Sequence, residues 1–355
     1  MNVDTKPSQT RGTRAAWADF AKGLTIILVV MMHSTLGVEL ALGKSAFMGD
    51  LVTFARSFRM PLFFAISGLF AAAALNRSWL KFADAKLVHF AYFYVLWSIL
   101  QIGVRLALAG HGQHDVSWHQ FALIPVSPFG TIWFIYILPL FFLVARFSRA
   151  VPPLLVFGAA ALMSLFQTHD SGIVVDSFTK YLVFFLGGLY AGPWIKALAA
   201  WAHDKVLGVT GLCLAFAAAN LQVMAWGQVE HPAFALAMGC FGAVTVVAFS
   251  SLIGRYRLCA PVRYCGQNSL AIYVAFTFPM VAARIIGAKT GLITDPDLLS
   301  VFVLATAVAG ALAMAWTARR VGLSFLFDRP AAFHLERAGV REERIAKATG
   351  QQAVN

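Results

Sequence analysis

Ten apolar runs dominate the chain, and each is about long enough to cross a bilayer. A membrane-spanning helix needs about 20 predominantly apolar residues, because it rises only about 1.5 Å per residue. The runs lie at residues 17–38, 50–75, 84–109, 130–147, 151–168, 177–195, 205–226, 233–253, 267–287 and 297–317. This pattern predicts an all-α, polytopic integral membrane protein with about ten transmembrane helices.

The distribution of lysine and arginine predicts which side of the membrane each loop occupies. Placing the N-terminus inside puts 21 of the 28 basic residues on the cytoplasmic side and four on the outer side. That asymmetry is what the positive-inside rule requires. We therefore expect both termini to be cytoplasmic, with an N-terminal segment at 1–16, a transmembrane domain at 17–317 and a tail at 318–355. The weakest boundary between two runs is the connection at 146–152. If the fourth and fifth runs formed one kinked helix, every later loop would change side.

Composition excludes several classes of protein. Hydrophobic residues make up 59% of the 355 residues and charged residues only 12%, with a mean hydropathy of +0.73. The net charge of +12 does not indicate nucleic-acid binding, because the basic residues are spread through short loops.

The chain lacks a phosphate-binding P-loop, a serine nucleophile elbow and a zinc-protease motif. Neither the four cysteines nor the loop residues His111, His114, Asp115 and His119 have the spacing of a closed metal site, so we expect no bound metal.

His33 is the first candidate for chemistry. It lies deep in the first apolar run, where an ionisable residue is costly and is by default a functional candidate. Lys22 precedes it by eleven residues, which in a helix is three turns and roughly 16 Å along the same face. Asp19 can pair with Lys22 at the entrance of the helix. A neutral histidine can act as a general base, whereas the structural alternative is a buried histidine bonded to a neighbouring helix.

The second apolar run carries two arginines that fall inside a span. Arg56 and Arg59 precede Pro61, which lacks an amide hydrogen and is expected to kink or unwind the helix. Counting from the outer ends of the two helices places both arginines near the level of His33, where they could hold an anion or a developing oxyanion. The alternative is that they extend to the outer headgroups, which suits Arg56 as well as a functional role does.

Two further polar clusters have structural as well as functional interpretations. Trp133 and Tyr136 lie one turn apart near the outer end of the fourth run, a position typical of an interfacial aromatic belt. Asn268 opens the ninth run within a polar stretch, and asparagine there is a natural helix N-cap.

Four motifs in order resemble the membrane-bound acyltransferase 3 family. They are Asp19-x-x-Lys22-Gly23 with His33, Arg59-Met60-Pro61-Leu62-Phe63-Phe64-x-x-Ser67-Gly68, Trp133-Phe134-x-Tyr136 and Gly266-x-Asn268-Ser269-Leu270. The chain departs from the usual pattern at Lys22, where the family has an arginine, so the charge remains but the bidentate fork is lost. Many members also carry a histidine shortly after the last motif, where this chain has Ala275 and Phe276. No second catalytic histidine is therefore expected.

The resemblance implies transfer of an acyl group from a cytoplasmic acyl-CoA-type donor, such as acetyl-CoA, to a hydroxyl of a bacterial envelope carbohydrate or related acceptor. It implies an enzyme of the inner membrane that holds no cofactor beyond this co-substrate. His33 would deprotonate the hydroxyl or relay the acyl group, Arg59 and Arg56 would stabilise charge, and Lys22 with Asp19 would hold the donor. Ser67, Trp133, Tyr136 and Asn268 are candidates for the lining of the acceptor cavity.

Two other classes of protein remain open from the sequence. A permease for a small organic anion would use the same arginines as its binding site and His33 as a proton relay. A non-catalytic membrane scaffold would leave the charges inside the spans without a purpose.

Overall fold

The computed structural model describes residues 16–107, 117–167 and 171–335, and its regular structure there is helical without strands. Within this part of the chain, seven helices are long and apolar enough to cross a membrane. They are α1 (Ala16–Leu42), the continuous helix Trp79–Ala107 that ends in α5 (His89–Ala107), Trp133–Ala150 containing α7 (Trp133–Phe147), α9 (Ile173–Tyr190), α11 (Val206–Ala225), α12 (Pro232–Ile253) and α16 (Pro296–Arg320).

The other three expected spans take different forms. α2 (Phe47–Leu69) is long but less apolar, because it carries Arg56 and Arg59. α8 (Pro153–Leu165) has only 13 residues. The ninth run is broken into α14 (Ser269–Ala275) and α15 (Thr277–Thr290), which meet at an angle of 52°. The count of ten spans and the cytoplasmic position of the termini therefore stay predictions, and both chain ends lie outside the described residues.

Several short helices were not expected from the sequence. α10 (Gly192–Ala202) and α13 (Ala260–Gln267) lie mostly between the expected spans. α4 (Trp79–Phe82) and α6 (His119–Leu123) are single turns between runs, and α3 (Ala72–Leu75) is a separate turn at the end of the run at 50–75. A π-helix, η1 (Ala83–Val88), precedes α5. The 3-10 turns are η2 (Ser148–Ala150), η3 (Arg257–Cys259), η4 (Ser324–Leu326) and η5 (Ala331–Phe333). The uncertain 146–152 connection is a helix break, since α7 ends at Phe147 and α8 starts at Pro153.

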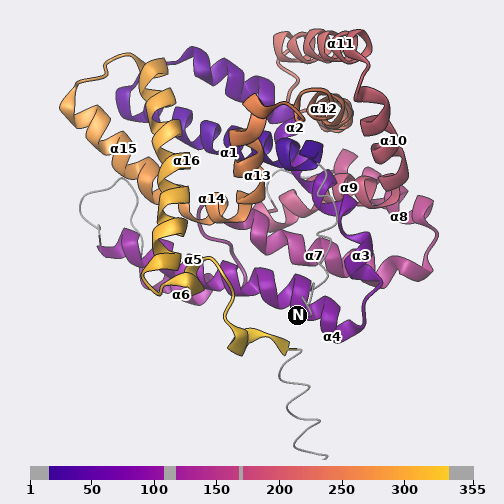
Figure 1. Cartoon of the computed structure of the whole chain (residues 1–355), viewed down its shortest axis with the longest axis horizontal. Helices are drawn as coiled ribbons and strands as arrows, with labels where there is room; N and C mark the ends of the chain where they lie inside the picture. The colour runs from indigo at the N-terminus through magenta and orange to yellow at the C-terminus, as the bar shows by residue number, and fades with distance from the viewer. Residues whose placement is uncertain (1–15, 108–116, 168–170, 336–355) are drawn as a thin grey trace, which may run out of the picture.

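α1 and α2 lie side by side across the middle of the molecule (Figure 1). α16 flanks α1 on one side, α10 to α12 gather at the other end, and α5 with α7 lies below. α1 packs against α2, α12, α13 and α16. Residues on α1 therefore face several elements that are far apart in the sequence.

Two pairs of glycines let helix backbones touch. At the crossing of α1 with α13, a methyl group added to Gly23 would overlap the carbonyl of Val262, and one added to Gly266 would overlap that of Asp19. The crossing of α2 with α9 is built in the same way, with Gly68 against Phe185 and Gly188 against Ala65. Small residues are the usual means of close helix packing in membranes, where lipid gives no hydrophobic drive for association.

Pro61 does not unwind α2, although unwinding was one of the two outcomes expected from the sequence. The helix is continuous from Phe47 to Leu69. The proline ring lies close to Gly239 of α12, and α2 packs between α1, α9 and α12 along its length. Packing on several sides holds the helix together where one backbone hydrogen bond is missing.

The segment that follows α16 packs against the helix that ends in α5, although the sequence assigns it to the tail. The Tyr92 hydroxyl donates to the Phe325 carbonyl at 2.8 Å, and the Trp97 indole donates to the Leu326 carbonyl at 2.9 Å. Arg329 forms a buried ion pair with Asp84 of the π-helix, with the nitrogen and oxygen 2.6 Å apart. The described part of the tail thus belongs to the packed body.

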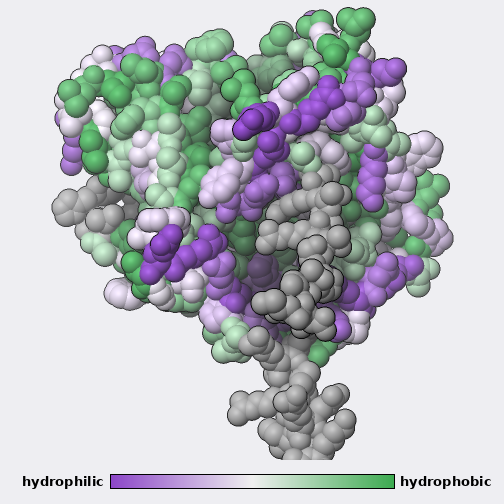
Figure 2. All heavy atoms as spheres, in the orientation of Figure 1, coloured by the Kyte–Doolittle hydropathy of each residue, from purple (hydrophilic) through white to green (hydrophobic). Residues whose placement is uncertain are grey.

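Apolar side chains cover much of the surface around α11, α15 and α16, and a hydrophilic band crosses the face seen in Figure 2. Leu207 and Leu214 of α11 and Phe302 and Trp316 of α16 are among the large exposed apolar residues. A soluble monomer rarely exposes apolar patches of such extent, whereas lipid requires them. The surface therefore suits a membrane protein.

The glycine crossings generate a prediction about stability. Gly188→Ala should destabilise the protein by about 1–3 kcal/mol, because the added methyl group cannot fit without separating α2 from α9. Gly158→Ala on α8 is the matched control, since an added methyl group there meets no atom within 4 Å. Thermal unfolding of the purified protein in detergent measures both. Equal midpoints for the two variants would show that the α2–α9 crossing is not tight.

Candidate active site

A cavity of about 320 Å³ contains the first sequence candidate, His33, and we call it the His33 cavity. Its walls come from α1, α2, α9, α14 and the start of α7. The lining residues are Val29, Met32, His33, Leu36, Val52, Thr53, Arg56, Arg59, Met60, Thr131, Trp133, Lys180, Tyr181 and Tyr273. The structure therefore brings together four candidates from the sequence, His33, Arg56, Arg59 and Trp133.

Arg59 is a buried cation whose hydrogen-bonding capacity is largely unused. Its side chain lies in the wall of the His33 cavity and the residue is 5% exposed. One terminal nitrogen donates to the Met32 sulfur at 2.8 Å, whereas Nε and the other terminal nitrogen have no partner among the described residues. Because a buried guanidinium without partners is costly, these free donors point to an anion or an oxyanion in the cavity.

Arg56 is held by an acidic residue that the sequence analysis did not identify. Glu230, in the loop before α12, forms an ion pair with Arg56 and a second one with Lys180, whose Nζ lies 3.3 Å from Oε2. The Arg56 side chain is 57% exposed. Arg56 therefore lies at the rim of the cavity, and the carboxylate fixes it beside Lys180 while Arg59 remains inside.

Aromatic rings form the wall opposite α1. Tyr181 stacks on Trp133 with centroids 5.8 Å apart and on Phe64 with centroids 5.1 Å apart. Trp133 is thus part of the cavity wall in addition to any role near the membrane surface. Tyr136 lies outside the cavity, because its hydroxyl donates to the Pro125 carbonyl at 2.9 Å and its ring packs on Tyr94.

Tyr273 and Phe276 bring the broken helix α14–α15 into the site. The Tyr273 hydroxyl donates to the Thr131 carbonyl and accepts from the Phe134 amide at 3.1 Å. Phe134 lies in the first turn of α7, where amides have no partner within the helix, so the phenol oxygen caps α7. The Phe276 ring packs on the His33 ring with centroids 5.4 Å apart.

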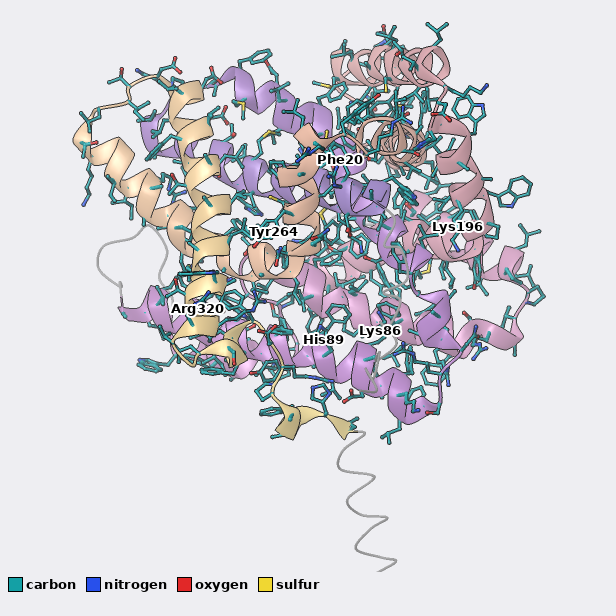
Figure 3. The ribbon with its side chains drawn as sticks, in the orientation of Figure 1. Phe20, Lys86, His89, Lys196, Tyr264 and Arg320 are labelled. Carbon is teal, nitrogen blue, oxygen red and sulfur yellow. The ribbon has the colours of Figure 1, made fainter. Side chains whose placement is uncertain are left out.

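A second cavity of about 230 Å³ contains Lys22, and we call it the Lys22 cavity. It is lined by Lys22, Phe63, Ile66, Ser67, His89, Phe90, Phe134, Leu138, Ser269, Leu270 and Tyr273. The Lys22 ammonium also lies 4.6 Å from the centre of the Phe70 ring. His89 and Lys86 lie one turn apart on the helix that contains η1 and α5 (Figure 3).

The structure separates some of the residues that the sequence groups together. Lys22 and Ser67 line the Lys22 cavity and not the His33 cavity, and Tyr273 lines both. Asp19 lines neither cavity. It is buried, and its carboxylate accepts a hydrogen bond from the Gln267 side-chain amide at 3.0 Å. Asn268 precedes α14 at the N-cap position, but its side chain donates back to the Tyr264 carbonyl and caps no amide.

Sequence reasoning missed several lining residues. His89 carries the same signal as His33, a histidine inside an apolar run, and could have been found. Lys180 was counted only as one of the four basic residues of the outer side, and it lies on α9, within the run at 177–195. Tyr181 and Tyr273 resemble ordinary apolar residues within their runs, and only the packing of the helices shows their positions. His111, His114 and Asp115 lie outside the described residues.

Comparison with protein families matches residues 15–316 to an acyltransferase domain, acyltransferase 3. The chain belongs to the acyltransferase 3 family. The match covers the whole region that builds both cavities, so the protein is a membrane acyltransferase. No curated protein and no solved structure matches the chain.

Arg59 generates a prediction that separates a functional cation from a structural one. Arg59→Met should leave the thermal unfolding midpoint unchanged or raise it, because it removes a buried charge that lacks a carboxylate partner. Arg329→Met is the control, since the Arg329 side chain is only 4% exposed but is paired with Asp84. Loss of that partner should cost about 3–5 kcal/mol. A comparable loss of stability in both variants would mean that Arg59 serves the fold.

Proposed function

We propose that this acyltransferase moves an acyl group from a cytoplasmic acyl-CoA-type donor, such as acetyl-CoA, to a hydroxyl of a bacterial envelope carbohydrate or related acceptor. The enzyme would act in the inner membrane as an O-acyltransferase. The observation that carries the proposal is that His33 and Arg59 line one cavity, where two of the three Arg59 nitrogens have no partner among the described residues. A base and an oxyanion stabiliser are what attack of a hydroxyl on a thioester requires.

His33 acts as the general base in this mechanism. Its imidazole takes the proton of the acceptor hydroxyl as the oxygen attacks the thioester carbonyl. The carbon–oxygen bond forms, the carbon–sulfur bond breaks, and the leaving thiolate receives the proton from the imidazolium. Phe276 packs on the ring and limits its orientation.

Arg59 stabilises the charge that develops on the carbonyl oxygen. Its free N–H groups need no rearrangement before they meet that charge, and in a site with little water such interactions are stronger than in bulk water. Arg56 and Lys180, held by Glu230, orient the acceptor at the rim.

The Lys22 cavity holds the donor. Lys22 contacts its phosphates, and the acyl-bearing arm points toward Tyr273 and the His33 cavity beyond it. Lys22 and His33 lie on one helix, so the two substrates meet at a distance that the helix fixes.

The deciding experiment uses purified protein in lipid vesicles with radiolabelled acetyl-CoA and a crude extract of envelope glycans. Transfer of label to an alkali-labile ester supports the proposal. Exchange of an organic anion across the vesicle membrane, without any new ester or free acetate, would instead support the permease that shares the same cations.

Replacing His33 should abolish transfer while the protein stays folded. His33→Ala should lower kcat by about 10²- to 10⁴-fold, because the hydroxyl loses its general base. His203→Ala is the control, since this histidine lies at the exposed end of α10 and lines neither cavity. Transfer rates near the wild-type value in His33→Ala would remove this residue from the chemistry.

Lys22 tests the donor position. Lys22→Ala should raise KM for acyl-CoA far more than KM for the acceptor, because a lost ground-state contact appears mainly as weaker binding. Lys22→Arg should keep most of the activity, since arginine also binds phosphate and supplies a bidentate fork. Steady-state kinetics with each substrate varied in turn measure both effects. An unchanged donor KM in Lys22→Ala would place the donor elsewhere.

A further inference from the structure

Tyr273 occupies the boundary between the two cavities. It lines both the His33 cavity and the Lys22 cavity, and its side chain is almost completely buried between them. Two neighbouring residues of α7 line one cavity each. Trp133 lines the His33 cavity and Phe134 lines the Lys22 cavity. The cavities are therefore neighbours with a tyrosine ring in the wall between them.

Two kinds of contact hold the ring in this position. The hydroxyl is fixed to the start of α7 by its bonds to the Thr131 carbonyl and the Phe134 amide. The ring also packs edge-on against Phe134, with centroids 5.7 Å apart. These contacts are made with the first turn of α7 and with Thr131 just before it, so the wall forms where α14 packs against the start of α7.

A thioester next to a basic imidazole needs protection from water. Water can replace the acceptor hydroxyl, since its oxygen bonds to the carbonyl carbon while the carbon–sulfur bond breaks, and the products are a free acid and a thiol. The His33 cavity reaches the surface at Arg56, whose side chain is half exposed, so water has access to it. Exclusion of water is a general way to prevent such side reactions.

We propose that Tyr273 is a positioning residue that keeps the acyl donor in the Lys22 cavity apart from water in the His33 cavity, and that its ring moves aside for transfer. This inference rests on the proposed function for the identity of the donor. The physical partition itself does not depend on that identity. Tyr273 takes no part in bond making.

Two substitutions distinguish the ring from the hydroxyl. Tyr273→Ala removes the wall, and hydrolysis of acetyl-CoA without acceptor should rise about tenfold or more. Tyr273→Phe keeps the ring and its contact with Phe134 and loses only the two hydrogen bonds of the hydroxyl, so hydrolysis should stay at the wild-type rate. Tyr273→Leu repeats the first test with less loss of packing. Tyr94→Ala is the control, because Tyr94 is as buried as Tyr273 and donates to the Ile124 carbonyl, but lines neither cavity.

A second measurement needs no catalysis. In a chain without its four natural cysteines, Ser67→Cys marks the Lys22 cavity and Thr53→Cys marks the His33 cavity. A small, membrane-impermeant methanethiosulfonate reagent is applied to intact cells and to inverted vesicles, and the preparation in which Thr53→Cys reacts identifies the open side. From that side Ser67→Cys should react only when Tyr273 is replaced by alanine or leucine.

The two measurements separate the possible failures. Labelling of Ser67→Cys that depends on Tyr273, without acyl transfer by any variant, would support the partition and reject the proposed function. Transfer by the wild type with unchanged hydrolysis and unchanged labelling in Tyr273→Ala and Tyr273→Leu would overturn the partition alone. Increased hydrolysis in Tyr273→Phe to the level of Tyr273→Ala would also overturn it, because the hydroxyl and not the ring would then matter.

Discussion

Backbone contact at two glycine crossings is the constraint on which both cavities depend. Gly23 and Gly266 join α1 to α13, and α13 leads directly into α14 with Tyr273. Gly68 and Gly188 join α2, with Arg59, to α9, with Tyr181. Each crossing thus sets the distance between two walls of the His33 cavity. Close approach of this kind is available only to glycine, because any side chain would meet a carbonyl of the other helix.

The energetic cost of the site is concentrated at Arg59. The other cations nearby have carboxylate partners, as Glu230 binds both Arg56 and Lys180. Arg59 has only the Met32 sulfur, and its remaining donors are unsatisfied among the described residues. A protein that can pair its buried charges elsewhere, as it does at Asp84 and Arg329, leaves this one open at the point where negative charge would develop.

The sequence predicted the parts of the site whose chemistry conflicts with an apolar helix. His33, Arg56 and Arg59 are recognisable because ionisable residues are costly in a membrane, and the structure brings them together. The sequence could not show that Lys22 and His33 line separate cavities, because helical spacing fixes their distance along α1 but does not show which residues lie between them. Tyr273 and Tyr181 were missed for a related reason: an aromatic residue in an apolar run gains its role only from its neighbours. The unwinding considered at Pro61 does not occur, because packing by α1, α9 and α12 supports the helix where the proline removes a backbone hydrogen bond.

The bend between α14 and α15 links the wall to the base. Tyr273 precedes the bend and closes on α7, whereas Phe276 stands at the bend itself and packs on His33. A straight helix places residues three apart on one face, so both rings would face nearly the same direction. With α14 and α15 meeting at 52°, Tyr273 of α14 reaches the first turn of α7, while both helices pack against α1 and α16. The bend thus lets one short segment serve two different helices, α7 through Tyr273 and α1 through Phe276. An interruption of this kind is tolerated at membrane depth because protein surrounds it on both sides.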